Sequence, residues 1–160
     1  MKTAFNKSDI KLLVLDVDGV LTDGGMYYSN SGDEFKKFNT KDGMGIKEII
    51  KKGVKVGFLS NGKNDILINN RAALLKVEFV YVGFDNKLEV LDKWLKQLNL
   101  TYKNVAYIGD DINDIEIIQR IGISACPCDA VKSVKAVANI TLDLKGGEGC
   151  VREFIDDYLM

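Results

Sequence analysis

The clearest indication of the fold is one continuous run near the N-terminus, Lys11-Leu12-Leu13-Val14-Leu15-Asp16-Val17-Asp18-Gly19-Val20-Leu21-Thr22-Asp23. Its first part, Lys11–Leu15, is apolar after the lysine and lacks the alternation of a half-exposed strand, so we expect a strand covered on both faces. Two carboxylates follow at its end, Asp16 and Asp18. Side chains two residues apart in a strand face the same way. The run therefore predicts a buried strand that delivers a pair of carboxylates to one edge of a parallel sheet.

The same pattern recurs along the chain. Further apolar runs, which we interpret as strands, are Val54–Leu59, Phe79–Val82, Val105–Ile108 and Gly122–Ala125. Amphipathic stretches alternate with them and are predicted helices: Gly43–Lys52, Asn64–Leu75, Lys87–Leu98, Ile112–Arg120, Val131–Ala138 and Val151–Leu159. This alternation predicts a three-layer, Rossmann-like α/β fold with a parallel sheet and helices on both faces. With 160 residues in total, we expect one domain spanning 1–160.

One segment, Gly25–Asn39, departs from this alternation. It carries the turn-forming cluster Asn30-Ser31-Gly32-Asp33, and we predict a β-hairpin flap in which Met26–Ser29 pairs with Glu34–Asn39. Within it, Lys36-Lys37 is predicted to be solvated surface. A separate cap domain would need at least about 50 residues. Only 43 residues separate Asp16 from Ser60 and 26 separate Ser60 from Lys87, so no cap domain is expected.

Composition excludes several classes of function. Lys plus Arg number 22 and Asp plus Glu 23, a net charge of −1 that argues against a nucleic-acid partner. Histidine is absent, which excludes Ser-His-Asp and Cys-His catalysis and every histidine-ligated metal site. No apolar run reaches 18 residues, so no membrane partner is expected. An odd number of cysteines, three, and a polar N-terminus without a signal-peptide core predict reduced thiols in a cytoplasmic protein.

Polar residues follow four of the five predicted strands, and the carboxyl ends of parallel strands meet at one edge, where ligands bind. These segments are Asp16–Asp23, Ser60-Asn61-Gly62-Lys63, Asp85-Asn86-Lys87 and Gly109–Asp114. The aspartates of this edge would repel one another by about 4 kcal/mol at 4 Å and an effective dielectric constant of 20. A hard cation offsets such repulsion, and Mg2+ prefers carboxylate oxygen and often bridges to phosphate. The hydroxyl of Ser60 and the ammonium of Lys87 suit a phosphate dianion.

Without histidine, an aspartate is a sound nucleophile toward phosphorus. We assign that role to Asp16 and expect Asp18 to protonate the leaving alcohol and later deprotonate the attacking water. Magnesium and Lys87 would offset the repulsion between Asp16 and the phosphate. The sequence alone thus predicts a magnesium-dependent phosphomonoesterase.

The four segments resemble, in order, the four motifs of the haloacid dehalogenase superfamily. Three further segments point to one family within this superfamily: Asp18–Gly24, Phe35–Gly43 and Gly146-Gly147-Glu148-Gly149-Cys150-Val151-Arg152-Glu153. They resemble segments of the 3-deoxy-D-manno-octulosonate 8-phosphate phosphatases, and the resemblance covers nearly the whole chain. That family implies magnesium-dependent homotetramers without a cap domain. We therefore expect hairpins of neighbouring subunits to pair and wall each other's sites, with Gly146–Gly149 as a mobile flap.

The resemblance also implies roles for individual residues. Asp16 would form an aspartyl-phosphate, Asp18 would add its backbone carbonyl to the metal, and Asp110 would be a direct metal ligand. The remaining assignments are metal support (Asp111, Asp114), phosphate binding (Ser60, Lys87, the Asn61 amide) and substrate binding (Arg71). Many members of the superfamily have Thr-Gly-Arg where this chain has Ser60-Asn61-Gly62, which keeps the hydroxyl but leaves recognition of the sugar acid open.

The implied reaction is hydrolysis of 3-deoxy-D-manno-octulosonate 8-phosphate to the free sugar acid and inorganic phosphate, a step in lipopolysaccharide biosynthesis. The alternative is a phosphatase for a nine-carbon 2-keto sugar acid 9-phosphate, in the sialic-acid or deaminated-sialic-acid series. A sugar phosphomutase is disfavoured because it usually needs a closing cap. A non-catalytic assembly module would be expected to have lost at least one of the catalytic residues.

Overall fold

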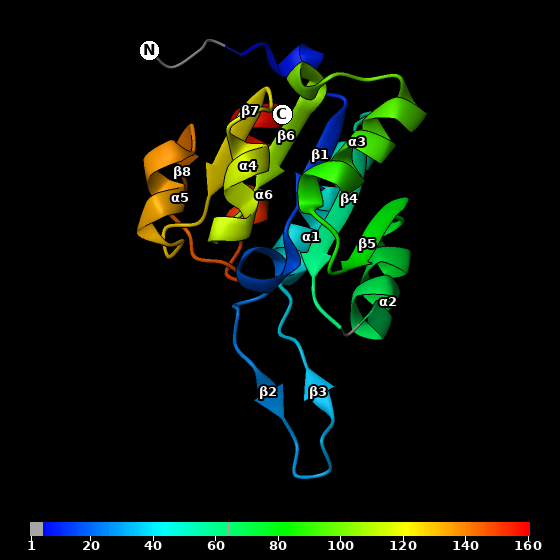
Figure 1. Cartoon of the computed structure of the whole chain (residues 1–160), viewed down its shortest axis with the longest axis vertical. Coiled ribbons are helices and arrows are strands. Elements are labelled where there is room, and N and C mark those ends of the chain that lie inside the picture. The colour runs from blue at the N-terminus through cyan, green and yellow to red at the C-terminus, as the bar shows by residue number, and fades with distance from the viewer. Residues whose placement is uncertain (1–4, 64) are drawn as a thin grey trace.

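A six-stranded parallel sheet forms the centre of the molecule, with strand order β5-β4-β1-β6-β7-β8 (Figure 1). The computed structural model describes residues 5–63 and 65–160. In chain order, the strands are β1 (Leu12–Leu15), β4 (Lys55–Asn61), β5 (Phe79–Gly83), β6 (Val105–Ile108), β7 (Ile123–Cys126) and β8 (Ile140–Thr141). The central position of β1, between β4 and β6, explains why its side chains are apolar on both faces.

Helices cover both faces of the sheet and complete three layers (Figure 1). Leu13 and Leu15 of β1 belong to one buried core, which is shared with α1 (Thr40–Lys51), α2 (Asp65–Leu75) and α6 (Cys150–Phe154). Leu12 and Val14 belong to the other, which is shared with α3 (Lys87–Leu98), α4 (Ile115–Ile118) and α5 (Lys132–Val137). The alternation of these leucines between two cores confirms the predicted three-layer α/β fold.

Some predicted boundaries were wrong. Helix α1 begins three residues before the predicted Gly43, because the Asn39 side chain accepts a hydrogen bond from the Lys41 amide and caps it. The predicted helix 112–120 divides into a 3-10 turn, Ile112–Asp114, and the short α4. The predicted helix 151–159 becomes α6 followed by a wider turn, Ile155–Leu159. The two-residue strand β8 was not predicted, and Asn64, the predicted start of α2, lies outside the described residues.

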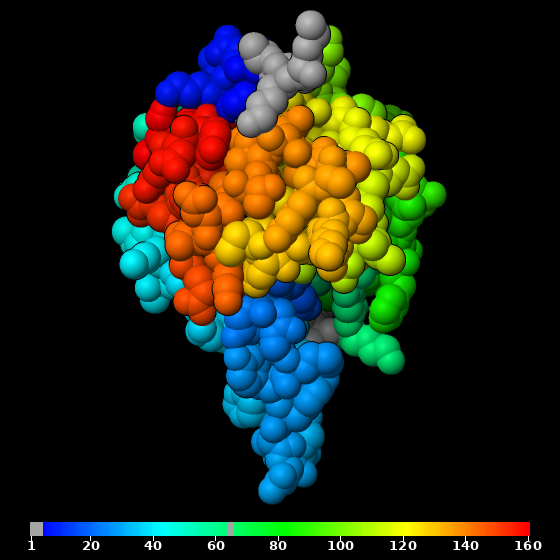
Figure 2. All heavy atoms as spheres, turned by 90° about the vertical axis from the view of Figure 1, so that its left-hand side faces the viewer, coloured from blue at the N-terminus to red at the C-terminus, as the bar shows by residue number. Residues whose placement is uncertain are grey.

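The predicted hairpin is present but much shorter. Strand β2 (Tyr27–Tyr28) pairs only with β3 (Glu34–Phe35), and an isolated bridge joins Thr22 to Phe38 at the base. The first strand has two extra residues between these pairings, in the segment that contains Gly24 and Gly25, and this interrupts the ladder. The hairpin extends beyond the carboxyl edge of the sheet as a narrow arm, on the side opposite the C-terminus (Figures 1 and 2).

The intervals that could hold a cap domain are occupied by fold elements. The hairpin and α1 lie between β1 and β4, and α2 and β5 follow β4. The space above the carboxyl edge is therefore bordered by the hairpin of the same chain.

Within residues 5–63 and 65–160, none of the helices has the length and apolar character needed to cross a bilayer.

Candidate active site

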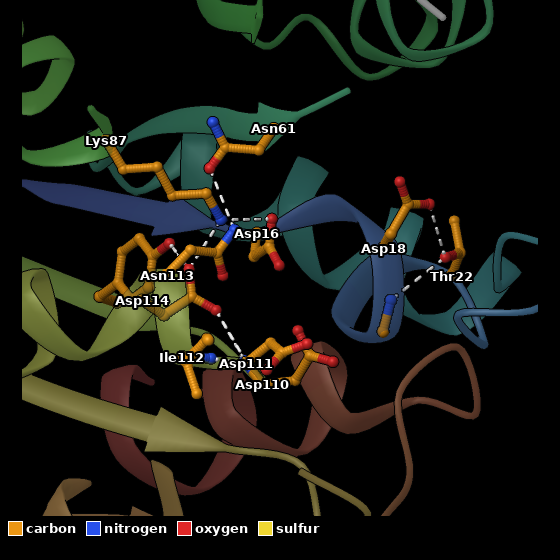
Figure 3. A network of polar contacts seen from close by, with 12 residues as sticks. Asp16, Asp18, Thr22, Asn61, Lys87, Asp110, Asp111, Ile112, Asn113 and Asp114 are labelled. Carbon is orange, nitrogen blue, oxygen red and sulfur yellow. Dashed lines mark hydrogen bonds and ion pairs between the residues drawn. The ribbon is translucent and has the colours of Figure 1, made fainter. Parts of the chain in front are cut away.

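A buried charge network lies where β1, β6 and α3 meet at the carboxyl edge. Lys87 Nζ donates to Asp16 Oδ1 at 2.8 Å and to Asp114 Oδ1 at 2.7 Å (Figure 3). All three side chains are buried. Burial opposes the charge of Lys87, but its two carboxylate partners outweigh this effect and raise its pKa, so the ammonium stays charged at neutral pH. Lys87 thus neutralises the nucleophile candidate from within the protein.

Asp114 organises the network and its hydrogen-bonding capacity is filled. Its Oδ1 accepts from Lys87 and from the Tyr107 hydroxyl at 2.6 Å. Its Oδ2 accepts from the backbone amides of Asp110 at 2.9 Å and Asp111 at 3.2 Å. A carboxylate offers about four lone-pair positions. Four donors therefore occupy Asp114, which fits the predicted supporting role better than direct contact with a metal.

The geometry around Asp110 fits a divalent cation. Oxygens of Asp16, Asp110 and Asp114 lie within 4.8 Å of one another. Asp110 Oδ1 is buried, and among the described residues it has no hydrogen-bond partner. Burial raises the pKa of Asp110 to about 6, and burial together with repulsion from Asp114 raises that of Asp16 well above its usual value. A hard cation between Asp16 and Asp110 would remove this penalty and satisfy the orphaned oxygen.

Gly19 makes the approach of Asp110 possible. It adopts a left-handed conformation with φ +85°, and a Cβ there would overlap with the Asp110 carboxylate. Gly19 also donates its amide to Thr22 Oγ1, at 3.3 Å. Position 19 therefore needs glycine for two reasons. A side chain would be strained in this backbone conformation, and it would overlap with Asp110, a candidate metal ligand.

Asp18 lies apart from the buried network and is held by other residues. Its Oδ1 accepts from Thr22 Oγ1 at 3.2 Å and from Lys36 Nζ at 2.7 Å (the Thr22 bond is drawn in Figure 3). Lys36, predicted to be solvated surface, has a side chain that is only 9% exposed. That prediction was wrong for Lys36 because its ammonium pairs with Asp18 and Glu34, whereas Lys37 is 51% exposed, as expected. Glu34 and Lys36 are two residues apart, a spacing that places side chains on one face of an extended segment, and this was the signal for the contact.

The predicted phosphate ligands divide between a cavity and the protein interior. Ser60, Asn61, Asp16, Asp18 and Asp110 are among the residues that line a cavity of about 200 Å³. Lys87 is not among the lining residues and lies behind Asp16. The Asn61 side chain is already engaged, since it donates to Gly83 O and Asp85 O and accepts from Asn113 Nδ2 at 3.0 Å. Only its backbone amide is therefore available for the predicted role.

A second, larger cavity of about 390 Å³ adjoins the first and shares Asp18, Ser60 and Asn61 with it. The hairpin supplies one wall, through Met26, Tyr28, Glu34 and Lys36, and the start of the β4–α2 connection supplies another, through Gly62 and Lys63. The pair of cavities provides a small polar compartment next to Asp16 and a wider one that could hold the rest of a substrate.

Comparison with known proteins agrees with this geometry. Residues 64–154 match the haloacid dehalogenase-like hydrolase family. Over 152 residues, the chain is 38% identical to the 3-deoxy-D-manno-octulosonate 8-phosphate phosphatase of Escherichia coli K12, covering 95% of this chain and 80% of the relative. The crystal structure of the Yersinia pestis phosphatase of the same name has a TM-score of 0.90 at 37% identity, covering 94% of this chain and 80% of that one.

The chain belongs to the 3-deoxy-D-manno-octulosonate 8-phosphate phosphatase family. It is accordingly a phosphatase of the haloacid dehalogenase-like type. A further family structure, from Moraxella catarrhalis, is described as a complex with a magnesium ion, a phosphate ion and KDO. It has a TM-score of 0.90 at 31% identity and covers 94% of this chain and 86% of that chain. The acidic cluster of the present phosphatase fits the same cation.

In this phosphatase, Arg71 lies at the root of the hairpin rather than against the acidic cluster. Its NH2 donates to Asn39 O at 3.2 Å, and its guanidinium lies 5.5 Å from the centre of the Phe38 ring. Neither cavity of the site includes it among the lining residues. The substrate role of Arg71 stays a prediction, and the structure shows Arg71 in contact with Phe38 and Asn39 at the hairpin base.

The glycine-rich stretch Gly146–Gly149 of this phosphatase is fixed to residues 19–23. We call this segment the nucleophile turn, because it follows the candidate nucleophile Asp16. Gly147 donates its amide to Val20 O at 2.9 Å, and the Asn39 side chain donates to Gly147 O. A Cβ on Gly146 or on Gly147 would overlap with the backbone of the 19–23 segment. The expectation of a mobile flap is therefore not met in this structure, because close backbone packing and hydrogen bonds hold the stretch beneath the site.

Proposed function

We propose that this protein hydrolyses 3-deoxy-D-manno-octulosonate 8-phosphate to the free sugar acid and inorganic phosphate. The supporting observation is a cation-fitting carboxylate cluster, next to two adjoining cavities, in a chain 38% identical to enzymes of that name. When bound between Asp16 and Asp110, Mg2+ would neutralise charge on the transferring phosphoryl group. Within this proposal, the reaction is a step in lipopolysaccharide biosynthesis.

The carboxylate of Asp16 is the nucleophile in this proposal. It attacks phosphorus, the bond from phosphorus to the sugar oxygen breaks, and an aspartyl-phosphate forms on Asp16. Lys87, 2.8 Å from Asp16 Oδ1, holds this carboxylate in place and offsets its charge as the anionic phosphate approaches. Water then attacks the phosphorus, releases inorganic phosphate and regenerates Asp16.

Asp18 carries the protons in both steps. It gives a proton to the departing sugar oxygen and later takes one from the attacking water. Asp18 lines both cavities, so its carboxylate reaches the phosphate compartment and the wider compartment where the sugar would lie. Ser60 and the backbone amide of Asn61 line the phosphate compartment and would donate to phosphate oxygens.

The nine-carbon 9-phosphates remain the alternative substrates, since the wider cavity has room at Gly62 where many superfamily members carry arginine. We expect magnesium-dependent phosphate release, with kcat/KM at least tenfold higher for the eight-carbon 8-phosphate than for the nine-carbon 9-phosphate. A tenfold ratio corresponds to about 1.4 kcal/mol of transition-state binding. The reverse preference would assign the protein to the synthesis of nine-carbon sugar acids. If neither ester released phosphate under conditions where the Escherichia coli relative is active, the proposed reaction would be overturned.

We also propose that the protein is a cytoplasmic homotetramer in which hairpins of neighbouring subunits pair. The outer face of the hairpin carries exposed aromatic side chains, with Tyr27 44% and Phe35 57% exposed, and short strands with open edges invite pairing. Sedimentation equilibrium should give four times the 17.8 kDa chain mass. Replacing both aromatic residues by serine should dissociate the assembly and reduce activity, whereas a fully active monomer would refute the proposal.

A further inference from the structure

The hairpin brings one lysine into the active site of its own chain. Lys36 Nζ donates to Asp18 Oδ1 at 2.7 Å and lies 3.3 Å from Glu34 Oε1. The next residue, Lys37, points elsewhere and pairs with Glu148 at 2.6 Å on the surface. Two adjacent lysines therefore have opposite environments, one enclosed by the site and one solvated.

The strand geometry of the hairpin explains the difference. Side chains alternate along β3 and the residues after it, so Glu34 and Lys36 share one face and Phe35 lies on the other. The first face lines the 390 Å³ cavity together with Tyr28 of β2. Phe35 is not among the lining residues and is 57% exposed. The hairpin thus has an inner polar face for the site and an outer aromatic face for assembly.

On its inner face, Lys36 contacts only one of the two oxygens of Asp18. Both side-chain hydrogen bonds that Asp18 accepts, from Lys36 and from Thr22, end on Oδ1. Thr22 is itself fixed by the amides of Gly19 and Gly24, which donate to its hydroxyl oxygen at 3.3 Å and 3.2 Å. Two donors therefore hold Oδ1 and leave Oδ2 free of these bonds for the reacting atoms.

We propose that Lys36 is a positioning residue for proton transfer, which fixes Asp18 so that Oδ2 meets the leaving oxygen and then the attacking water. This inference rests on the proposed phosphatase mechanism and extends it to the hairpin. Burial opposes the charge of Lys36, but its bonds to Asp18 and Glu34 outweigh that effect and raise its pKa. The ammonium is therefore charged throughout the physiological pH range and does not take part in the proton transfer itself.

The role has a specific kinetic consequence. In the first step, Asp18 Oδ2 gives its proton to the sugar oxygen as the bond from that oxygen to phosphorus breaks. An alcohol leaves poorly without this proton, whereas p-nitrophenolate leaves readily as the anion. Loss of the Lys36 bond to Oδ1 should therefore slow alkyl esters and spare the aryl ester. The ratio kcat/KM reports this first step alone, because hydrolysis of the aspartyl-phosphate comes after it.

The test compares K36M with wild type and with K37M, a matched control on the exposed neighbour. Three substrates are used with saturating Mg2+: p-nitrophenyl phosphate, glycerol phosphate as an alkyl ester without a carboxylate, and the eight-carbon sugar acid 8-phosphate. For K36M we expect kcat/KM to fall about 30- to 100-fold for both alkyl esters and less than threefold for the aryl ester. This loss does not exceed the lower end of the roughly 10²- to 10⁴-fold contribution of general acid catalysis, because Asp18 itself is kept. K36R should recover part of the loss, and K37M should resemble wild type.

Three patterns would overturn the inference. Equal losses on all three substrates would mean a structural role, and unchanged rates would mean no role. A loss confined to the sugar acid would mean that Lys36 binds the substrate carboxylate. Wild type that releases phosphate from the two simple esters but not from the sugar acid would contradict the proposed substrate, while the ratio between those two esters would still decide the role of Lys36.

Discussion

Asp16→Asn is expected to abolish phosphate release, with kcat at least about 10⁴-fold below wild type, in the range seen when catalytic nucleophiles are removed. An amide cannot form the aspartyl-phosphate. The fold should persist, because the asparagine oxygen can still accept the hydrogen bond that Lys87 donates to position 16. Thermal melting without Mg2+ should show stability equal to or above that of wild type, since burial raises the pKa of Asp16 and its charge is costly there.

The matched control for this variant is Asp156→Asn. Asp156 is an exposed aspartate that pairs with Arg152 one helical turn away, and surface pairs of this kind contribute little. It should keep wild-type activity. Adding Mg2+ should raise the melting temperature of wild type more than that of D16N, because D16N lacks one of the candidate ligands. Residual turnover in D16N above about 1% of wild type would show that another residue is the nucleophile.

Gly19→Ala should reduce kcat/KM about 10²-fold or more, a loss comparable to a misplacement of about 1 Å at a reacting centre. The new methyl group would overlap with the carboxylate of Asp110, and it would sit on a backbone with φ +85°. Asp110 must then turn away from Asp16 or the nucleophile turn must shift. The concentration of Mg2+ needed for half-maximal activity should rise in parallel, and isothermal titration would measure the loss of affinity directly.

Gly53→Ala separates the overlap from the backbone strain. Gly53 has φ +90°, nearly the same conformation, but a Cβ there meets no atom within 4 Å. Both variants should lose about 1–2 kcal/mol of stability from the left-handed backbone. Only G19A should lose activity and Mg2+ affinity. If G53A lost activity to the same degree, or if G19A kept it, the proposed contact between Gly19 and Asp110 would have no catalytic importance.

Much of this architecture could be predicted because the sheet is buried on both faces. The boundaries of β6 and α3 matched their predictions, since an uninterrupted apolar run and a regular leucine spacing leave few alternatives. The common edge that holds Asp16, Ser60 and Asp110 was predicted because each of these residues directly follows a predicted strand or lies in the segment after one. These predictions needed only local pattern and the rule that parallel strands end at one edge.

The failures have a common physical origin. Lys36 was predicted to be solvated surface, but its environment depends on the ion pairs that it makes with Asp18 and Glu34. Tyr107 looked like an ordinary core aromatic within β6, and only its 2.6 Å bond to Asp114 reveals a positional role. Both contacts depend on how separate elements are placed in space, which strand and helix periodicity does not specify.

The four donors around Asp114 also limit how the protein can change over evolutionary time. They come from three segments, and asparagine at this position would present an N–H group to two of them. A neutral residue at position 87 would likewise leave two buried carboxylates without their positively charged partner. We therefore expect single substitutions in this network to cost activity or stability. Met26, Tyr28, Lys63 and Ile68 line the wider cavity and take no part in the network. Drift toward new sugar phosphates, in nature or in a mutant library, should therefore proceed through the cavity wall while the chemistry beneath it stays constant.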